Sequence, residues 1–364
     1  MKVTVHYLRT KGWDGTTRYS EALVAGLRSL GVDVRPHIPF YREWRIGPLR
    51  VGGILTLRAS TLLPVVRRHL VHATQYYYNP PLVPADVITV HDVMPVARPE
   101  LYGLTARGLR HHRRLLRRAL RHSRIVTPTE HSRQEILRCF PAQADPARIH
   151  VVPQGVDHAR FHPEPGERPA AFQDGMLNVL VVMNAELRKR VDLVAEAALA
   201  LPFVRLVHAG RWIPPPAHRL AGERLRPFAE RLAKEGRYVA LGQVDEPTLR
   251  ALYAHADVVV HPSMAEGFGL PPLEALACGA RVLASDIPPH REVLGDAARY
   301  VALDAGAIGA ELAALHAGTA RFPPRAERLA HARQFTWTRT AQGTLAVYEA
   351  AMARNAARSP SGPS

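Results

Sequence analysis

The chain has 364 residues, 47% of them hydrophobic, which is more than one core usually holds and predicts two domains. Its two cysteines, Cys139 and Cys278, lack the spacing of a metal site or a disulfide framework, the first residues form a strand pattern, and no apolar run approaches the roughly 18 residues of a membrane span, so we expect a cytoplasmic protein. The net charge of +16 points to an anionic partner, and its excess lies in residues 1–175, where 26 Lys and Arg face 14 Asp and Glu.

The first half of the chain alternates predicted strands and helices, as a parallel α/β sheet requires. A strand at Val3–Leu8 leads through a glycine-containing loop into a helix over residues 16–30, and Gly15 in that loop lets the backbone approach a ligand closely. Further strands are expected at 32–35, 69–73, 87–91 and 125–128.

Two of these strands end in residues suited to contacting a ligand. Tyr76, Tyr77 and Tyr78 follow the strand at 69–73, and their aromatic faces could stack on the sugar rings of an acceptor. Packing of these tyrosines over the domain core is an equally good interpretation. His91 ends the next strand, where we expect it to project into a ligand space, whereas the adjacent Asp92 is expected to be structural.

A basic amphipathic helix is predicted over residues 107–124. Nine arginines lie between Arg98 and Arg124, and at helical spacing they share one face while the leucines share another. Such a helix could make peripheral contact with the inner face of an anionic membrane, or it could hold a lipid-linked diphosphate. A solvated arginine-rich face is nearly as good an interpretation.

The polar, proline-rich segment 162–173 is interpreted as the linker between two domains. Residues 1–165 would form the N-terminal domain and residues 166–336 a second α/β domain. Strands of the second domain are expected near 178–183, 204–209, 239–242, 258–262 and 281–285, with a helix over 191–200. A last helix follows at 337–357, and the tail 358–364, rich in Ser, Pro and Gly, is expected to be disordered.

Three adjacent cations follow the first strand of the second domain. The guanidinium of Arg188 can clamp phosphate oxygens with two parallel hydrogen bonds, and the ammonium of Lys189 adds a movable point charge. We therefore expect these cations to meet a diphosphate. A solvated helix start is the alternative interpretation, and it is a better alternative for Arg190 than for Lys189.

Residues 261–279 form the most informative segment of the chain. A buried strand ends there, glycines allow a tight turn, and Pro271 and Pro272 suit the first turn of a helix whose N-terminal N–H groups can hold a diphosphate. Glu266 before the turn and Glu274 in the helix can accept hydrogen bonds from sugar hydroxyls. The residues expected to bind a sugar nucleotide, the donor, are Glu274, Gly267, Phe268, Gly269 and Leu270, together with Gly15 of the first domain.

This segment resembles the Glu-x7-Glu signature of the retaining glycosyltransferases of family 4. The resemblance covers nearly the whole chain and implies the GT-B fold, in which two Rossmann-like parallel-sheet domains face each other across a cleft. It implies that Glu266 contacts the transferred hexose and that Glu274 contacts the nucleotide ribose. It also implies that Lys189 and Arg188 bind the leaving nucleotide, that His91 contacts the sugar from the first domain, and that the last helix packs back on that domain.

The expected function is therefore a retaining, metal-independent transfer of a hexose from a nucleoside diphosphate sugar to a glycan or lipid-linked acceptor, with mannose as the first choice. The chain contains no Asp-x-Asp and no ligand-spaced cluster, so we expect no metal and no cofactor. One alternative is a non-catalytic basic protein that binds nucleic acid or a membrane surface. Nucleic acid is not expected, because no RNA-binding motif accompanies the charge. The other alternative is a hydrolase or epimerase acting on sugar nucleotides.

Overall fold

A computed structural model describes residues 1–7, 15–37, 40–46, 49–55, 69–78, 85–211 and 219–358. The chain divides into two compact units. Unit 1 comprises Met1–Val96, Ala106–Pro153 and Trp337–Ser364, and unit 2 comprises Ala97–Thr105 and Gln154–Thr336.

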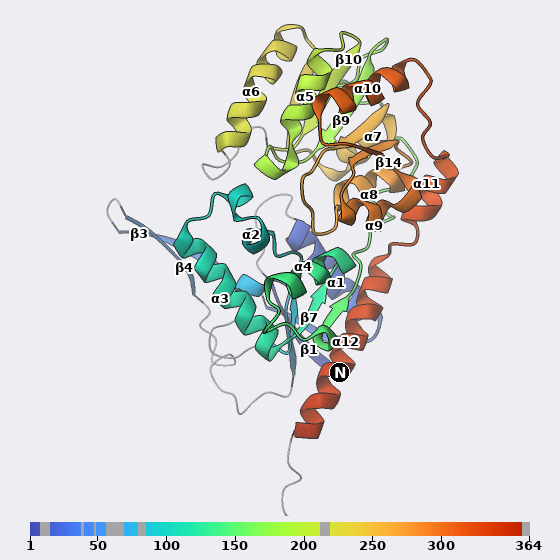
Figure 1. The fold of residues 1–364 in the computed structure, drawn as a ribbon. Helices are drawn as coiled ribbons and strands as arrows, with labels where there is room; N and C mark the ends of the chain where they lie inside the picture. Colours follow the sequence, from blue (N-terminus) through green and yellow to red (C-terminus); the bar gives the residue numbers. More distant parts are fainter. Residues whose placement is uncertain are drawn as a thin grey trace, which may run out of the picture. The chain divides into compact units, whose positions relative to one another are not determined.

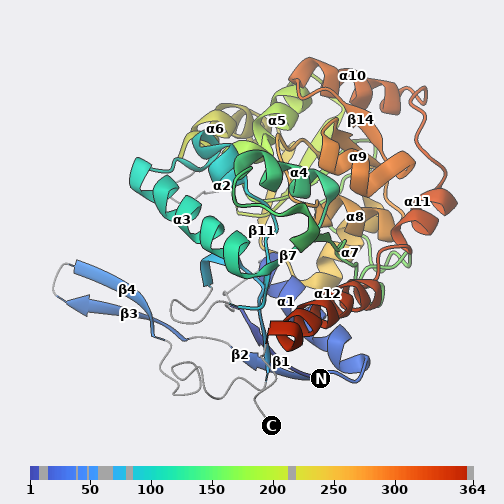
Figure 2. The same cartoon turned by 60° about the horizontal axis from the view of Figure 1, so that its bottom comes forward.

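Unit 1 is built on a parallel sheet of six strands in the order β2-β1-β5-β6-β7-β8 (Figure 1). These strands are β1 (Lys2–His6), β2 (Asp33–His37), β5 (Leu70–Ala73), β6 (Val87–Thr89), β7 (Arg124–Thr127) and β8 (Ile149–Val151). A separate antiparallel pair is formed by β3 (Phe40–Ile46) and β4 (Leu49–Leu55) (Figure 2). The helices are α1 (Gly15–Ser29), α2 (Met94–Ala97), which ends in unit 2, α3 (Ala106–His122), α4 (Glu130–Cys139) and α12 (Trp337–Arg358).

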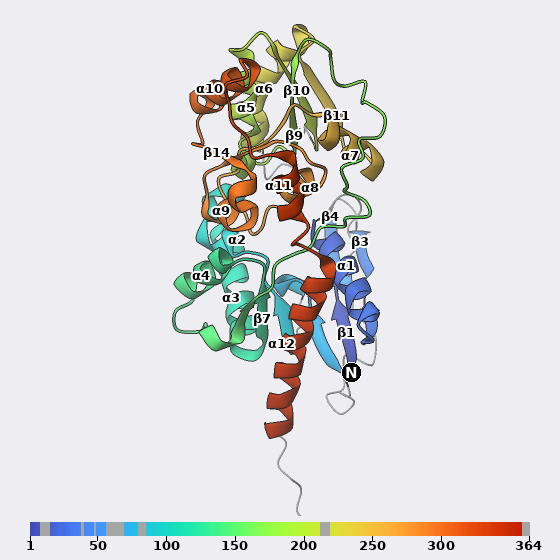
Figure 3. The same cartoon turned by 90° about the vertical axis from the view of Figure 1, so that its right-hand side faces the viewer.

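Helix α12, from the end of the chain, completes the core of unit 1 (Figure 3). It packs on α1 where Gly26 leaves room: a Cβ added at Gly26 would lie 2.9 Å from the Cβ of Ala341. The buried Tyr348 lies in the same core, and its hydroxyl lies 2.6 Å from Nδ1 of His72 on β5. Oγ1 of Thr89 lies 2.8 Å from Nε2 of the same ring, so both ring nitrogens of this buried histidine have partners.

Unit 2 is built on a second parallel sheet of six strands, in the order β11-β10-β9-β12-β13-β14. These strands are β9 (Leu177–Val182), β10 (Val204–Ala209), β11 (Tyr238–Gly242), β12 (Val258–His261), β13 (Val282–Ser285) and β14 (Arg299–Val301). Its helices are α5 (Val191–Leu199), α6 (Arg219–Lys234), α7 (Glu246–His255), α8 (Leu270–Ala277), α9 (Pro288–Leu294), α10 (Ala305–His316) and α11 (Arg325–Ala332).

The central strands of unit 2 are short runs of β-branched and other apolar residues. Both β9 and β12 are buried along nearly their whole length, as parallel strands covered by helices on both faces require. Helices α5 and α10 contribute apolar side chains to the same core, among them Val194 and Ile308, which are fully buried. Burial of the sheet on both faces leaves its strand ends as the places where polar residues can gather.

The predicted class, two parallel-sheet α/β units, is confirmed, and most predicted strands lie within one or two residues of the observed ones. The division into units differs from the predicted boundary at residue 165. Residues 154–165 belong to unit 2, because Val156 pairs with Thr336 and Arg160 donates a 2.5 Å hydrogen bond to Glu246. Helix α12 extends to Arg358, the first residue of the expected tail, and residues 359–364 lie outside the described part of the chain.

Candidate active site

The candidate site of unit 2 lies where the strand order of its sheet reverses. From β9 the chain adds β10 and β11 on one side, and it then returns to add β12 on the other side of β9. In open α/β sheets, ligands bind beyond the carboxyl ends of the strands at such a switch point. The loop after β9 carries Arg188 and Lys189, and the loop after β12 carries Glu266, so the expected residues come from the two strands that flank the switch.

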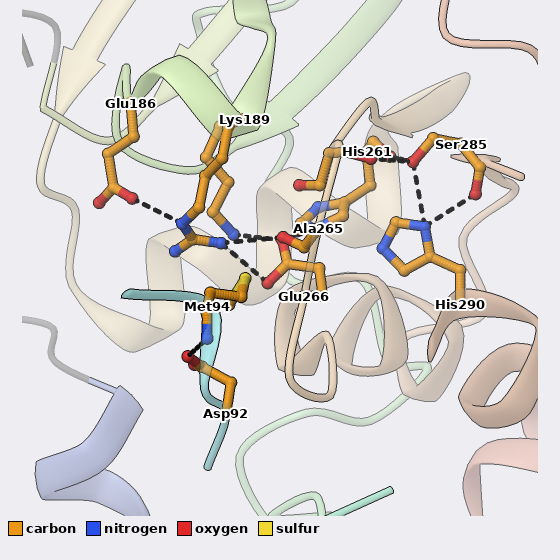
Figure 4. A network of polar contacts seen from close by, with 11 residues as sticks. Asp92, Met94, Glu186, Lys189, His261, Ala265, Glu266, Ser285 and His290 are labelled. Atoms are coloured by element: carbon orange, nitrogen blue, oxygen red, sulfur yellow. Dashed lines mark hydrogen bonds and ion pairs between the residues drawn. The ribbon is translucent and has the colours of Figure 1, made fainter. Parts of the chain in front are cut away.

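Glu266 is the residue on which the polar contacts of these loops converge (Figure 4). Nζ of Lys189 lies 2.5 Å from its Oε1, and Nη1 of Arg188 lies 3.1 Å from its Oε2. Nε2 of His261, the last residue of β12, lies 3.1 Å from Oε1. Arg188 also donates a hydrogen bond to the carbonyl of Ala265 and forms an ion pair with Glu186. These contacts hold its guanidinium between the loop after β9 and the loop after β12.

The electrostatics of this cluster favour an ionised carboxylate between cations. Burial alone would raise the pKa of Glu266, but the charges of Lys189 and Arg188 outweigh burial and hold that pKa well below its usual value of 4.5. Burial lowers the pKa of His261 to about 3, so its ring is neutral near pH 7. Two cations, Lys189 and Arg188, and two carboxylates, Glu266 and Glu186, therefore meet in a largely buried cluster, where the N–H groups of the cations are the donors that an anionic ligand could use.

Arg188 and Lys189 were expected to meet a diphosphate, and the structure brings both of them to Glu266. The third cation, Arg190, pairs instead with Asp192 on α5 and adopts a left-handed backbone conformation with φ of 48°. Arg190 thus lies at the start of α5, which was the alternative interpretation of this residue, and its side chain is held by Asp192. The site has two cations at the carboxylate rather than three.

The glycine loop after Glu266 enters α8 through Gly269, whose φ of 95° suits glycine. Pro271 and Pro272 have no N–H, so among the first three residues of α8 only Leu270 carries a backbone donor. Phe268 is buried against the ring of Phe335. The expected binding of an anion by this loop stays a prediction.

Glu274 lies inside α8, and its side chain is 2% exposed. The hydroxyl of Tyr253, a buried residue of α7, lies 3.5 Å from its Oε2. Glu274 therefore lies in the same helix that begins at the glycine loop but is nearly covered in this structure. Its expected contact with a ribose stays a prediction.

The loop after β9, which begins with Met183 and Asn184, is closely approached by Gly210 after β10. A Cβ added at Gly210 would lie 2.0 Å from the carbonyl oxygen of Met183. The side chain of Asn184 accepts a hydrogen bond of 3.0 Å from the backbone N–H of Arg211. The loops after β9 and β10 are thus in direct contact, and this contact positions the segment that carries Arg188 and Lys189.

Two residues that the sequence reasoning did not select lie beside Glu266. A ring nitrogen of His261, a ring nitrogen of His290 and a carboxylate oxygen of Glu266 all lie within 4.8 Å of one another. Such a trio could bind a metal ion, but the ammonium of Lys189 and the guanidinium of Arg188 already occupy the carboxylate and would repel a cation. The sequence around Glu266 does not indicate His290, because His290 lies far along the chain, after the next strand, β13. Its place at the carboxyl end of the neighbouring strand is the signal that could have found it.

Candidate residues of unit 1 also follow strands at the reversal of their sheet, which lies between β1 and β5. Gly15 begins α1, and the loop before it, residues 8–14, is outside the described residues. Tyr76 is buried and its hydroxyl lies 2.8 Å from Nδ1 of His112, so its ring is a packing residue. Tyr77 is 41% exposed and its ring packs edge-on against Tyr76, with the centroids 5.1 Å apart, while the side chain of Tyr78 is outside the described residues.

His91 lies two residues beyond the end of β6, in an extended segment rather than in the strand as expected. Its ring packs edge-on against Tyr19 with the ring centroids 4.7 Å apart. The carboxylate of Asp92 accepts a 3.0 Å hydrogen bond from the backbone N–H of Met94 and so caps α2, the structural role expected for it. Because His91 belongs to unit 1, its approach to the Glu266 cluster stays a prediction.

Helix α3 carries the predicted basic face. Leu116, Ala119 and Leu120 are buried, and Asp and Glu are absent from the helix. Its exposed basic residues are Arg107, Arg110, His111, Arg113, Arg114, Arg117, Arg121 and His122. Among the described helices, none combines the length and apolar character needed to cross a bilayer.

The sequence of this chain is similar to those of known proteins. Residues 167–314 match the family model described as "Glycosyl transferases group 1". The chain is 30% identical over 286 residues to O-antigen chain mannosyltransferase B of Escherichia coli, a match that covers 75% of this chain and 72% of the relative. It is 34% identical over 255 residues to D-inositol 3-phosphate glycosyltransferase of Mycolicibacterium vanbaalenii, covering 65% of this chain and 54% of that protein. The chain thus spans about half the length of some curated relatives.

Solved structures share the fold at low sequence identity. Sucrose-phosphate synthase from Thermosynechococcus elongatus superposes with a TM-score of 0.74 at 18% identity, covering 97% of this chain and 100% of that one. HepE of Anabaena, solved in complex with UDP, gives a TM-score of 0.67 at 16% identity, covering 96% and 100%. Likeness at this level of identity establishes the architecture of the two parallel-sheet units.

Proposed function

The chain belongs to the group 1 glycosyl transferases, and on that premise we propose that it is a retaining hexosyltransferase that uses a nucleoside diphosphate sugar as donor and a glycan or lipid-linked hydroxyl as acceptor. We take GDP-mannose as the first donor to test, because one relative of this chain is an O-antigen chain mannosyltransferase. HepE, whose fold is similar, was solved with UDP, so UDP-sugars are the second choice.

The observation that carries this proposal is the pairing of Lys189 and Arg188 with Glu266 at the switch point of the sheet. A carboxylate fixed between two cations can accept hydrogen bonds from a hexose while the cations face the adjacent diphosphate. Ionised groups make the strongest hydrogen bonds in proteins, so such a cluster holds both parts of a sugar nucleotide.

In the proposed reaction, the acceptor oxygen forms a bond to the anomeric carbon on the face from which the nucleotide departs. The bond between that carbon and the phosphate oxygen breaks, and the acceptor proton moves to an oxygen of the leaving diphosphate. Glu266 orients the hexose, and Lys189 and Arg188 stabilise the charge that develops on the diphosphate. Glu274 binds the ribose, and His91 holds the sugar from unit 1.

The proposed reaction requires no divalent metal. Two fixed cations and the N–H groups of the glycine loop supply positive charge at the place where a metal ion would otherwise neutralise the diphosphate. We therefore expect transfer in the presence of EDTA at the rate seen without it, and abolition of transfer by EDTA would contradict this part of the proposal.

The donor assignment is tested by binding. We expect Lys189→Ala and Glu274→Ala to weaken binding of GDP-mannose, measured by calorimetry, because the first loses a charge at the diphosphate and the second loses a ribose acceptor. A thermal-shift screen of GDP-, UDP-, ADP- and dTDP-sugars identifies the donor, since a ligand that binds only the folded state raises its melting temperature. Donor affinity unchanged in both variants would contradict the assignment.

The acceptor side is assigned to unit 1, with Tyr77 as a stacking residue and α3 as a surface for an anionic lipid or a lipid-linked diphosphate. Co-sedimentation with vesicles containing anionic lipid measures this contact, and we expect retention to fall as salt rises. Vesicles that fail to retain the protein at low salt would contradict membrane contact. Mass analysis of products with and without acceptor separates a transferase from a hydrolase or epimerase.

A further inference from the structure

His290 is a buried residue at the start of α9 whose two ring nitrogens are in different situations. The side chain is fully buried, and Nε2 has no hydrogen-bond partner within the part of the chain that the structure describes. A buried polar atom without a partner costs about 1–3 kcal/mol, so its presence calls for a reason. The proposed function leaves this atom unused.

The partners of the other nitrogen settle which one carries the proton. Nδ1 of His290 lies 2.9 Å from the carbonyl oxygen of Ser285, and a carbonyl oxygen can only accept, so Nδ1 carries the hydrogen. The hydroxyl of Ser285 donates instead to the carbonyl of Ser263 at 2.5 Å. Burial lowers the pKa of His290, which keeps the ring neutral. Nε2 is therefore an acceptor with a bare lone pair.

The Nε2 side of the ring faces the glycine loop. A Cβ added at Gly269 would lie 3.5 Å from Cδ2 and 3.8 Å from Nε2 of His290, so a side chain there would be in van der Waals contact with this edge of the ring. A ring nitrogen of His290 also lies within 4.8 Å of a carboxylate oxygen of Glu266. Figure 4 shows His290 beside Ser285, on the side of Glu266 away from Glu186.

Glu266 has limited capacity left for a ligand. Its Oε1 accepts from Lys189 and His261, which uses both lone pairs, and its Oε2 accepts from Arg188. One acceptor position of the carboxylate remains, and His290, a ring nitrogen of which lies within 4.8 Å of a carboxylate oxygen of Glu266, offers a second acceptor at Nε2. Two neighbouring acceptors match two hydroxyl groups of one sugar.

We propose that Nε2 of His290 accepts a hydrogen bond from a hydroxyl of the transferred hexose, next to the hydroxyl that Glu266 accepts, and that this contact helps to select the donor sugar. The inference rests on the proposed function, because it takes the hexose to lie at Glu266. A sugar that lacks this hydroxyl would leave a buried acceptor unpaired, which is how a polar site rejects a wrong ligand.

Two substitutions test the roles of Nδ1 and Nε2 of His290 separately. In His290→Asn the amide nitrogen can take the place of Nδ1 and donate to Ser285, while the position of Nε2 is lost. In His290→Gln the longer side chain carries its amide oxygen to the position of Nε2 and supplies an acceptor there. His316→Asn is the control, because that histidine is exposed and stacks on Phe203, away from the site.

The measurement is calorimetric affinity for GDP-mannose and for GDP alone, and for UDP-glucose and UDP alone. We expect His290→Asn to weaken the sugar nucleotide about tenfold, the worth of one buried hydrogen bond, while affinity for the nucleotide without sugar stays within about twofold. His290→Gln should recover most of the loss, and His316→Asn should match the unaltered protein.

The outcomes distinguish this inference from the function on which it rests. If the unaltered protein binds neither nucleotide nor sugar nucleotide of either pair, the proposed function is wrong and the role of His290 falls with it. If it binds the sugar nucleotides but His290→Asn leaves the ratio of the two affinities unchanged, or weakens both equally, the assignment of His290 alone is overturned.

Discussion

At Glu266, two cations and a neutral histidine converge on a carboxylate that is 8% exposed. Each of these groups would be costly to bury alone, and together they satisfy one another. Glu266 and Lys189 could be selected from the sequence as site residues, because a known spacing marked them. Their mutual contact could not, because 77 residues separate them and only the adjacency of β9 and β12 brings them together.

The buried charge of Glu266 predicts a large effect on stability. Glu266→Gln keeps the size of the side chain but leaves the buried Lys189 without its paired carboxylate and Arg188 with Glu186 alone, so we expect the free energy of unfolding to fall by about 3 kcal/mol. Asp286→Asn is a matched control, because Asp286 pairs with Arg291 where both side chains are about half exposed, and it should cost less than about 1 kcal/mol. Urea denaturation measures both, and equal losses would contradict the prediction.

Gly210 predicts a second effect at the residue scale. In Gly210→Ala the new Cβ would meet the carbonyl oxygen of Met183, so we expect a loss of about 3 kcal/mol of unfolding free energy together with weaker donor binding as the loop shifts. Gly236→Ala is the control: its φ of 70° is also unfavourable for alanine, but nothing lies within 4 Å of the added Cβ. Its cost should be about 1 kcal/mol. Similar melting temperatures for the two variants would contradict the close contact.

At the scale of elements, the strands and helices that the sequence predicted best are those with an uninterrupted pattern. The strands β9 and β12 are runs of buried valine and leucine, and α1 has apolar residues at helical spacing. Helix α6 contains Pro227 within its span, and α10 mixes glycine and alanine with little contrast between its faces, so neither pattern was specific enough to predict. The side chains of β3 and β4 lie outside the described residues, and nothing explains why that pair escaped prediction.

Helix α12 predicts a test of its own. Tyr348→Phe removes the hydroxyl that bonds Nδ1 of the buried His72, so we expect the unfolding free energy to fall by about 1–3 kcal/mol. Tyr77→Phe, at an exposed ring of the same unit, should change it by less than about 0.5 kcal/mol. Chemical denaturation of the two variants gives the comparison, and a Tyr348→Phe protein as stable as the unaltered one would show that the buried bond contributes nothing.

At the scale of the whole molecule, each unit buries a neutral histidine, and this predicts acid sensitivity. Burial lowers the pKa of His72 and of His261 to about 3 from the usual 6.5. Between these values the unfolded chain binds protons that the folded protein does not, so the free energy of unfolding falls as pH falls below 6.5. By pH 5 each histidine should cost about 2 kcal/mol. Urea unfolding at pH 7, 6 and 5 measures this, and a constant unfolding free energy would contradict it.

Composition and alternation of elements were enough to predict two parallel-sheet units, because a sheet covered on both faces by helices requires that pattern. The boundary between the two units was harder to predict from the sequence. The segment 154–165 is polar and proline-rich like a linker, yet Val156 and Arg160 bind it to unit 2. Contacts between segments far apart in the sequence, like the place of His290 beside Glu266, follow from strand order, which local patterns do not specify.

The chain leaves unit 1 after Pro153 and re-enters it at Trp337, and these two crossings run side by side where Val156 pairs with Thr336. Synthesis therefore releases the first sheet long before the helix that completes its core has been made. A fragment ending at residue 153 would lack Tyr348 and leave Nδ1 of the buried His72 without its partner, while Nε2 would keep Thr89. Helix α12, which is translated after the whole of unit 2, thus decides when unit 1 finishes folding.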